Sequence, residues 1–243
     1  MVMLLRNSER GFRDHGWLKS YHSFSFGDYY NPTFTGFRNL RVINEDYISS
    51  KSGFPTHEHA NMEILTYMLT GSLMHEDTLG HKKVIYGGDV QYMRAGHGMS
   101  HSEYNNSATE TTHFLQIWLL PLKRDVLPTY DQINLERAII DNKLKLIAAG
   151  LGDDWNRKAE GVIELNSDAK IYASILHPNY ELTHTPMPHK SIWIQVITGK
   201  IIVNGLHLER GDAIAFDSGE QVSIHAVHDS HFLLFNLGSP GMV

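Results

Sequence analysis

The second half of the chain repeats a pattern found in the first half. Residues 193–204 resemble residues 63–74, and each stretch is an apolar run interrupted by a Thr-Gly pair. Residues 210–213 likewise resemble residues 87–90 around a Gly-Asp pair. An internal repeat of this size indicates duplication of one supersecondary unit, and the rhythm of short strands and turns is typical of barrels. We therefore predict an all-β protein of two facing barrels.

Two pairs of potential metal ligands lie on predicted strands of the first half. In an extended strand the side chains alternate between faces, so His57 and His59 point the same way, and so do His101 and Glu103. Two predicted antiparallel hairpins lie between the pairs and return the chain to its start. Imidazole nitrogens and a carboxylate suit a divalent first-row ion, and four protein ligands leave one or two positions open. The alternative is that these four side chains bind no metal and are surface residues or are hydrogen-bonded in the core. Two pairs that converge make this alternative less favoured.

The spacing of these residues resembles the two sequence motifs of the cupin superfamily. The first motif is His57-x-His59-x-x-x-Glu63 followed by Gly71, and the second runs from Gly88 through Gly96 to His101 and Asn105. The chain more narrowly resembles the pirin family, in a similarity that covers nearly all of it and is dense over residues 17–120. The stretches that carry this resemblance are residues 24–32, 57–67, 88–93 and 101–103.

Pirins are two-cupin proteins of this length, so the resemblance implies two double-stranded β-helix, or jelly-roll, barrels. We expect an N-terminal metal-binding cupin over residues 1–130, which includes an aromatic N-terminal segment. We expect a C-terminal cupin over residues 131–243 that lacks metal ligands.

The two motifs contain two candidate glutamate ligands. Glu63 stands where most single-domain cupins place their glutamate, whereas the pirin pattern uses Glu103. One small ion that already binds three histidines does not easily accommodate both glutamates. Glu63 is therefore assigned a structural role or a hydrogen bond to a metal-bound histidine. The predicted metal ligands are His57, His59, His101 and Glu103.

The repeat places residues that cannot hold a transition metal at the corresponding C-terminal positions. Alignment on the Thr-Gly turns puts Thr185, Met187 and Ser191 opposite His57, His59 and Glu63. Alignment on the Gly-Asp pairs puts Ile224 and Ala226 opposite His101 and Glu103. One metal per chain is the expectation.

Two further segments have predicted roles. Residues 1–31 are rich in aromatic side chains, which favours a flap on the outside of a barrel over the alternative, a lid that contacts substrate. His22, within this segment, is expected to be structural. Residues 123–142 are predicted to connect the two barrels and to contain a short helix around residues 132–138.

Composition excludes several classes of function. The chain has no cysteine, so it has neither disulfides nor a thiol nucleophile. A net charge of −6 without a Lys/Arg-rich run argues against direct binding to nucleic acid or to an anionic membrane. No apolar run approaches the ~20 residues that span a bilayer. We expect a cytoplasmic protein; the oligomeric state is open, with a monomer as the expectation.

The resemblance also implies an activity, because bacterial pirins include quercetin 2,3-dioxygenases. The expected substrates are a flavonol such as quercetin and O2, with release of carbon monoxide, and Glu103 is the expected catalytic base. Fe2+ is the expected metal, with Cu, Ni, Co, Mn and Zn as alternatives. Two other hypotheses stay open: a non-enzymatic metal-binding regulator that acts through protein partners, and a small-molecule-binding cupin without turnover.

Overall fold

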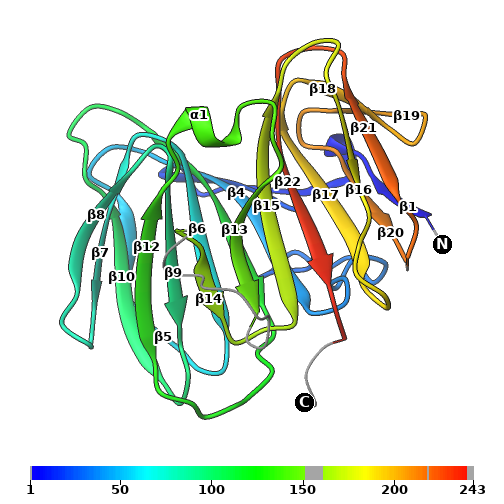
Figure 1. Cartoon of the computed structure of the whole chain (residues 1–243). Helices are drawn as coiled ribbons and strands as arrows, with labels where there is room; N and C mark the ends of the chain where they lie inside the picture. Colours follow the sequence, from blue (N-terminus) through cyan, green and yellow to red (C-terminus); the bar gives the residue numbers. More distant parts are fainter. Residues whose placement is uncertain (1, 151–160, 218, 240–243) are drawn as a thin grey trace. The chain divides into compact units, whose positions relative to one another are not determined.

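The computed structural model describes residues 2–150, 161–217 and 219–239. These residues form strands almost throughout, with a 3-10 turn at Asn7–Glu9 and one short α-helix, α1 (Arg137–Ile140) (Figure 1). The prediction of an all-β protein is confirmed. In the described part of the chain, no helix is long and apolar enough to cross a membrane.

The chain divides into two compact units, and each unit contains one seven-stranded and one four-stranded sheet. Among the described residues, the N-terminal unit takes 11–135 and 165–167, and the C-terminal unit takes 2–10, 136–150, 161–164, 168–217 and 219–239.

The larger N-terminal sheet has the spatial order β12 (Thr129–Asn134), β9 (Asp89–Arg94), β6 (Glu63–Thr70), β11 (Thr112–Leu119), β4 (Leu40–Ile48), β3 (Leu18–His22) and β2 (Gly11–Asp14). The smaller N-terminal sheet has the order β5 (Gly53–His59), β10 (Met99–Asn105), β7 (Ser72–Asp77) and β8 (Lys82–Tyr86).

The larger C-terminal sheet has the order β1 (Val2–Leu5), β20 (Ala213–Phe216), β17 (Ser191–Thr198), β22 (Ser230–Leu237), β15 (Ala169–Leu176), β13 (Lys145–Gly150) and β14 (Ile163–Leu165). The smaller one has the order β16 (Glu181–His184), β21 (Val222–Ala226), β18 (Lys200–Val203) and β19 (Leu206–Glu209).

The internal repeat is visible in the strand order of the two units. The run β9-β6-β11-β4 of one large sheet corresponds to β20-β17-β22-β15 of the other, and β5-β10-β7-β8 corresponds to β16-β21-β18-β19. The Thr-Gly pairs form the equivalent turns after β6 and β17. Gly71 (φ +80°) and Gly199 (φ +85°) adopt the left-handed conformation there, and a Cβ at either would meet neighbouring atoms under 3 Å away. The predicted pair of cupin barrels is confirmed.

The units differ from the division expected at residue 130 in two respects. Strand β1 belongs to the C-terminal unit, because Val2–Leu5 pairs with β20 and buries Leu5. Strand β12, which pairs with β9, extends the N-terminal unit to Leu135. The expected connector therefore contains a strand, and its helix is shorter than predicted. The sequence of β12, Thr-Tyr-Asp-Gln-Ile-Asn, has little apolar alternation from which a strand could be recognised.

Aliphatic side chains fill the interior of the C-terminal barrel. A single buried cluster joins residues of β17, β20 and β22 with residues of β18, β19 and β21. Ile224 and Ala226, which align with His101 and Glu103, are both part of it. The apolar clusters of the N-terminal unit are smaller and leave a cavity between its sheets.

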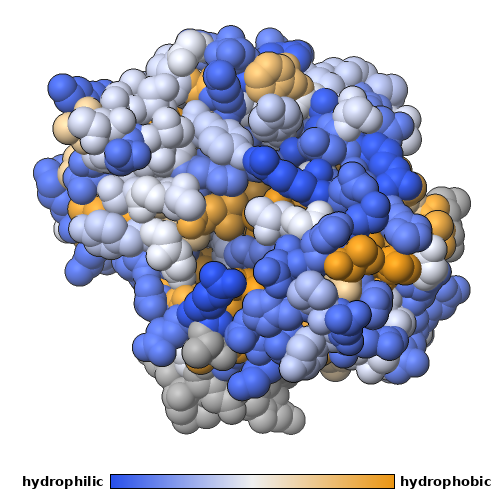
Figure 2. All heavy atoms as spheres, turned by 90° about the horizontal axis from the view of Figure 1, so that it is seen from above, coloured by the Kyte–Doolittle hydropathy of each residue, from blue (hydrophilic) through white to orange (hydrophobic). Residues whose placement is uncertain are grey.

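The surface in Figure 2 is mostly hydrophilic, and its hydrophobic residues form separate patches. Scattered exposed apolar atoms are normal in folded proteins and indicate no binding surface by themselves. The cavity of the N-terminal unit, by contrast, is lined by the predicted metal ligands.

Candidate metal centre

Strands β5 and β10 bring the three predicted histidine ligands together. They pair antiparallel, with His101 directly opposite His57 and Met99 opposite His59. The ring centroids of His57, His59 and His101 lie 4.5 to 5.0 Å apart. One nitrogen from each ring lies within 4.8 Å of one from each of the others. The three imidazoles are thus arranged around a common point.

The hydrogen bonds of these rings leave nitrogens available for a metal ion. His57 Nδ1 lies 2.8 Å from the carbonyl oxygen of Pro55, so Nδ1 carries the proton and Nε2 keeps its lone pair. His101 Nε2 is buried and has no hydrogen-bond partner in the described structure. A buried polar atom without a partner is costly unless something else binds it. The residues therefore fit a metal ion.

The surroundings of the rings favour the neutral imidazoles that metal binding requires. Burial, together with the neighbouring His57, lowers the pKa of His101 to about 3. Burial and the neighbouring His101 lower the pKa of His59 to about 4. Both rings are therefore neutral at pH 7 and can offer a lone pair.

Glu103 lies two positions beyond His101 on β10, and a register shift in the β5 pairing falls between them. Its carboxylate accepts hydrogen bonds from Thr66 Oγ1 at 3.3 Å and Gln116 Nε2 at 3.2 Å. Burial raises its pKa above the ordinary value. The ligand atoms of Glu103, His101 and His75 form a second group within 4.8 Å of one another. The three predicted histidine ligands therefore form one group, and Glu103 lies in the other. His101 belongs to both groups.

His75, which the sequence interpretation did not select, lies behind His101. It is fully buried on β7 directly opposite Glu103, and its Nδ1 lies 3.4 Å from His101 Nδ1. Its Nε2 lies 2.9 Å from Asp77 Oδ2, and Gln91 Nε2 lies 3.3 Å from its Nδ1. The sequence offered one indication of this role: His75 and Asp77 are two residues apart on a predicted strand, so their side chains point to the same face.

The charge of the Asp77 carboxylate determines which ring nitrogens of His75 and His101 carry protons. Burial alone would raise the pKa of Asp77, but hydrogen bonds from His75 and His81 hold it below its ordinary value. The ionised carboxylate accepts from His75 Nε2–H, which makes His75 Nδ1 an acceptor. His101 Nδ1, at 3.4 Å, and Gln91 Nε2, at 3.3 Å, share the lone pair of this nitrogen as donors. With its proton on Nδ1, His101 keeps the lone pair of Nε2. Such outer partners fix the tautomer and orientation of a metal-binding histidine.

We expect His75→Phe to weaken metal binding about 10- to 100-fold, the usual cost of removing an outer partner of a ligand. The aromatic ring preserves packing but cannot accept the proton of His101. Titration of metal-free protein with Ni2+ or Co2+ measures the affinity. The Co2+ absorption spectrum reports a changed geometry independently of activity. An affinity and spectrum equal to those of wild-type protein would contradict this positioning role.

Glu63 lies outside the histidine cluster. Its buried carboxylate accepts hydrogen bonds from the Tyr92 hydroxyl and, at 2.7 Å, from the backbone N–H of Asn166. Arg94 Nε lies 3.9 Å away. Burial raises the pKa of Glu63 above its ordinary value. None of the described histidines donates to this carboxylate, so its contacts support the structural one of the two predicted roles.

We expect Glu63→Gln to retain bound metal, because Glu63 contacts none of the candidate ligands. The amide oxygen can still accept from Tyr92 or Asn166, while the weakened bonds lower thermal stability by about 1 to 3 kcal/mol. Elemental analysis and thermal unfolding measure the two effects. Loss of the metal from this variant, with retention in Glu103→Gln, would show that the two carboxylates have been assigned the wrong way round.

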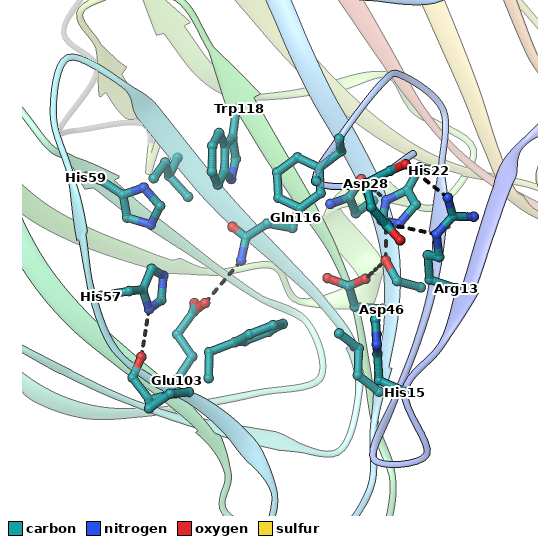
Figure 3. Close-up of a pocket in the computed structure, with 18 of the residues that line it drawn as sticks. Arg13, His15, His22, Asp28, Asp46, His57, His59, Glu103, Gln116 and Trp118 are labelled. Carbon is teal, nitrogen blue, oxygen red and sulfur yellow. Dashed lines mark hydrogen bonds and ion pairs between the residues drawn. The ribbon is translucent and has the colours of Figure 1, made fainter. Parts of the chain in front are cut away.

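The candidate ligands open onto a cavity of about 530 Å³ in the N-terminal unit. Figure 3 shows His57, His59 and Glu103 on one side of it, with Trp118 and Gln116 beside them. Trp17 and Phe26 also line the cavity. The aromatic N-terminal segment is therefore part of the cavity wall, so the expectation of a flap confined to the outside is wrong. His22 also lines the cavity and bonds Asn44 through Nδ1 at 2.7 Å.

The fold and this site define a two-domain cupin protein with a candidate metal centre in its N-terminal barrel. The pirin family model matches residues 5–119, and a model described as the quercetinase C-terminal cupin domain matches residues 156–237. A quercetin 2,3-dioxygenase of Escherichia coli is 39% identical over 237 residues, which cover 98% of this chain and 99% of the relative. A pirin-like protein of Caulobacter vibrioides is 34% identical over 92% of this chain and 94% of its own. The chain belongs to the pirin family.

Solved structures agree with this assignment. The crystal structure of YhhW from Escherichia coli has a TM-score of 0.91 and 38% identity, over 100% of both chains. A structure of the bacterial pirin YhhW in complex with nickel(II) has a TM-score of 0.90 and 38% identity, over 98% of this chain and 100% of the other.

Proposed function

We propose that this chain is a metal-dependent dioxygenase of the pirin type that cleaves flavonols such as quercetin with O2. The observation that carries the proposal is the buried Nε2 of His101, which has no hydrogen-bond partner among the described residues. His101 clusters with His57 and His59, and the three rings line a cavity with aromatic walls. A cavity of about 530 Å³ lies within the range of ligand sites, roughly 300 to 1,000 Å³. The 39% identical relative from Escherichia coli, a quercetin 2,3-dioxygenase, supports the reaction class.

In this proposal His57, His59, His101 and Glu103 hold one divalent transition metal. When bound, such an ion accepts the 3-hydroxyl oxygen of a flavonol, lowers its pKa and orients it towards O2. Three neutral imidazoles and a carboxylate suit Fe2+, and they also suit nickel, which a solved relative binds. Fe2+ remains the expectation for this chain.

The protein's own residues supply binding and proton transfer. Glu103 accepts the 3-hydroxyl proton, while Thr66 and Gln116 hold its carboxylate in place through the two hydrogen bonds that they donate. Trp118 and Phe26 enclose the planar rings and exclude water. In the overall reaction both atoms of O2 enter the depside product, and C3 of the flavonol leaves as carbon monoxide.

Oxygen uptake and headspace carbon monoxide test the proposal together. Protein loaded separately with Fe2+, Ni2+, Co2+, Mn2+ and Cu2+ is mixed with quercetin, and each rate is compared with that of the same free ion. Carbon monoxide formed in step with oxygen consumption supports 2,3-dioxygenation. If fully loaded protein binds quercetin yet consumes no oxygen above free metal with any ion, the enzyme proposal fails. The regulatory alternative then requires a protein partner.

A further inference from the structure

A row of polar side chains crosses the floor of the N-terminal cavity. In the large sheet Thr66 on β6 is directly opposite Gln116 on β11, and Gln116 is opposite Asn44 on β4. Asn44 is in turn opposite His22 on β3. Directly opposite residues point to the same face of a sheet. All four side chains are buried.

The row begins at the metal centre and ends in a second polar group. At one end Thr66 and Gln116 donate to Glu103. At the other end lie four cavity-lining residues that we call the distal cluster, namely Ser20, His22, Asn44 and Asp46. Figure 3 labels two of them, His22 and Asp46. Adjacent strands are about 4.8 Å apart, so the two strand spacings from Gln116 to His22 amount to about 10 Å. This is roughly the length of a three-ring aromatic molecule.

The distal cluster has hydrogen-bonding capacity that faces the cavity. Asp46 has an exposed fraction of 3%. Among the described side chains, Ser20 is the one that donates to it, through its hydroxyl. Burial, followed by the nearby charges of Glu103 and Glu45, raises the pKa of Asp46 to about 7. A buried carboxyl with one donor is costly to the fold, and groups of this kind in cavities are candidates for ligand binding.

Aromatic rings lie along the cavity wall. Trp17 packs edge-on against Phe54 with centroids 5.2 Å apart, and Phe26 packs edge-on against Trp118 at 5.3 Å. All four rings line the cavity. Such walls favour a flat aromatic ligand over a flexible or globular one.

We propose that the distal cluster is a second anchor, which binds a hydroxyl on an outer ring of a planar polyhydroxylated aromatic whose chelating hydroxyl and keto oxygens, on the central ring, lie at the metal centre. The inference rests on the proposed function for its ligand class, and it adds what selects among flavonols. Asp46 and Ser20 exchange hydrogen bonds with the outer hydroxyl, while His22 and Asn44 hold the wall beside it. A flavonol without outer hydroxyls leaves these groups unsatisfied and binds less tightly.

The test compares two ligands without turnover. Quercetin has hydroxyls on its outer rings, and 3-hydroxyflavone keeps the chelating pair but lacks all other hydroxyls. The dissociation constants of both are measured from the visible absorption shift of metal-loaded protein without oxygen. Ser20→Ala/Asp46→Leu removes both partners and leaves neither orphaned. We expect this variant to lower the preference for quercetin over 3-hydroxyflavone about 10- to 100-fold, the worth of a hydrogen bond to a charged group.

Glu45→Gln is the matched control. Glu45 precedes Asp46 on β4, points to the other face of the sheet and bonds His113 Nε2 at 3.0 Å. We expect its ligand preference to change far less than that of the double variant, because it keeps Ser20 and Asp46 and removes only the smallest of the effects that raise the pKa of Asp46. Metal content and melting temperature are measured for every variant. If the double variant does not fold, the same ratio is measured for Asp46→Asn and for Ser20→Ala.

The outcomes separate the inference from the proposed function. An unchanged preference in the folded variants overturns the distal anchor and leaves flavonol cleavage standing. If metal-loaded wild-type protein binds neither flavonol, both the ligand class and the anchor fail. A lowered preference with retained binding of 3-hydroxyflavone supports the anchor, whether or not the protein turns quercetin over.

Discussion

We expect His101→Ala to bind divalent metal more than about 100-fold more weakly than wild-type protein. His101 belongs to both groups of candidate ligands, and its Nε2 is a buried nitrogen without a hydrogen-bond partner among the described residues. Removing an outer partner of a ligand already costs about 10- to 100-fold, so removing the ligand itself costs more. Titration of metal-free protein with Ni2+, together with elemental analysis of purified protein, measures the loss.

His97→Ala serves as the matched control. His97 lies in the turn before β10, is exposed and does not line the cavity. Its variant should bind metal as wild-type protein does. Metal-free His101→Ala should lose about 1 to 3 kcal/mol of stability relative to the metal-free wild type, because the smaller residue leaves a buried space and His75 loses a donor. Thermal unfolding checks that the variant is folded at the temperature of the titration. Full metal occupancy in His101→Ala would place the centre elsewhere.

The convergence of His57, His59 and His101 was predictable from sequence. Strand alternation fixes which way neighbouring side chains point, and this local rule places His57 beside His59 and His101 beside Glu103 on their strands. The prediction of two successive hairpins is wrong: β7 and β8 form one hairpin, β6 pairs with β9 around it, and this nested arrangement returns β10 to β5. The internal repeat extended the reasoning to the second barrel, where Thr185, Met187, Ile224 and Ala226 align with the four ligands.

His75 was not predictable in this way, because its role depends on register. Its strand looks like many half-apolar strands, and its importance arises from pairing opposite Glu103. The polar row from Thr66 to His22 depends likewise on the order β6-β11-β4-β3, which places four sequence-distant positions side by side. The location of β1 in the C-terminal sheet is a third case, since nothing in Val2–Leu5 distinguishes one sheet edge from another.

We expect Glu103→Gln to lower quercetin turnover per bound metal by about 10²- to 10⁴-fold, the usual contribution of general-base catalysis. The amide occupies the same space and can still bond Thr66, and Gln116 can rotate its side-chain amide to accept from the new N–H. It cannot take the 3-hydroxyl proton. The dissociation constant for quercetin should therefore change much less than the rate, and both can be followed by absorption in one sample.

Glu63→Gln is the control that separates a specific loss from the cost of altering a buried carboxylate. It makes the same chemical change on β6, in the other N-terminal sheet, at a carboxylate that accepts hydrogen bonds from Tyr92 and Asn166 and does not line the cavity. Its turnover per bound metal should match that of wild-type protein. Because Glu103 is also a proposed ligand, each rate is divided by the measured metal content. Wild-type turnover per bound metal in Glu103→Gln would assign the proton to another acceptor, and Glu103 would then be at most a metal ligand.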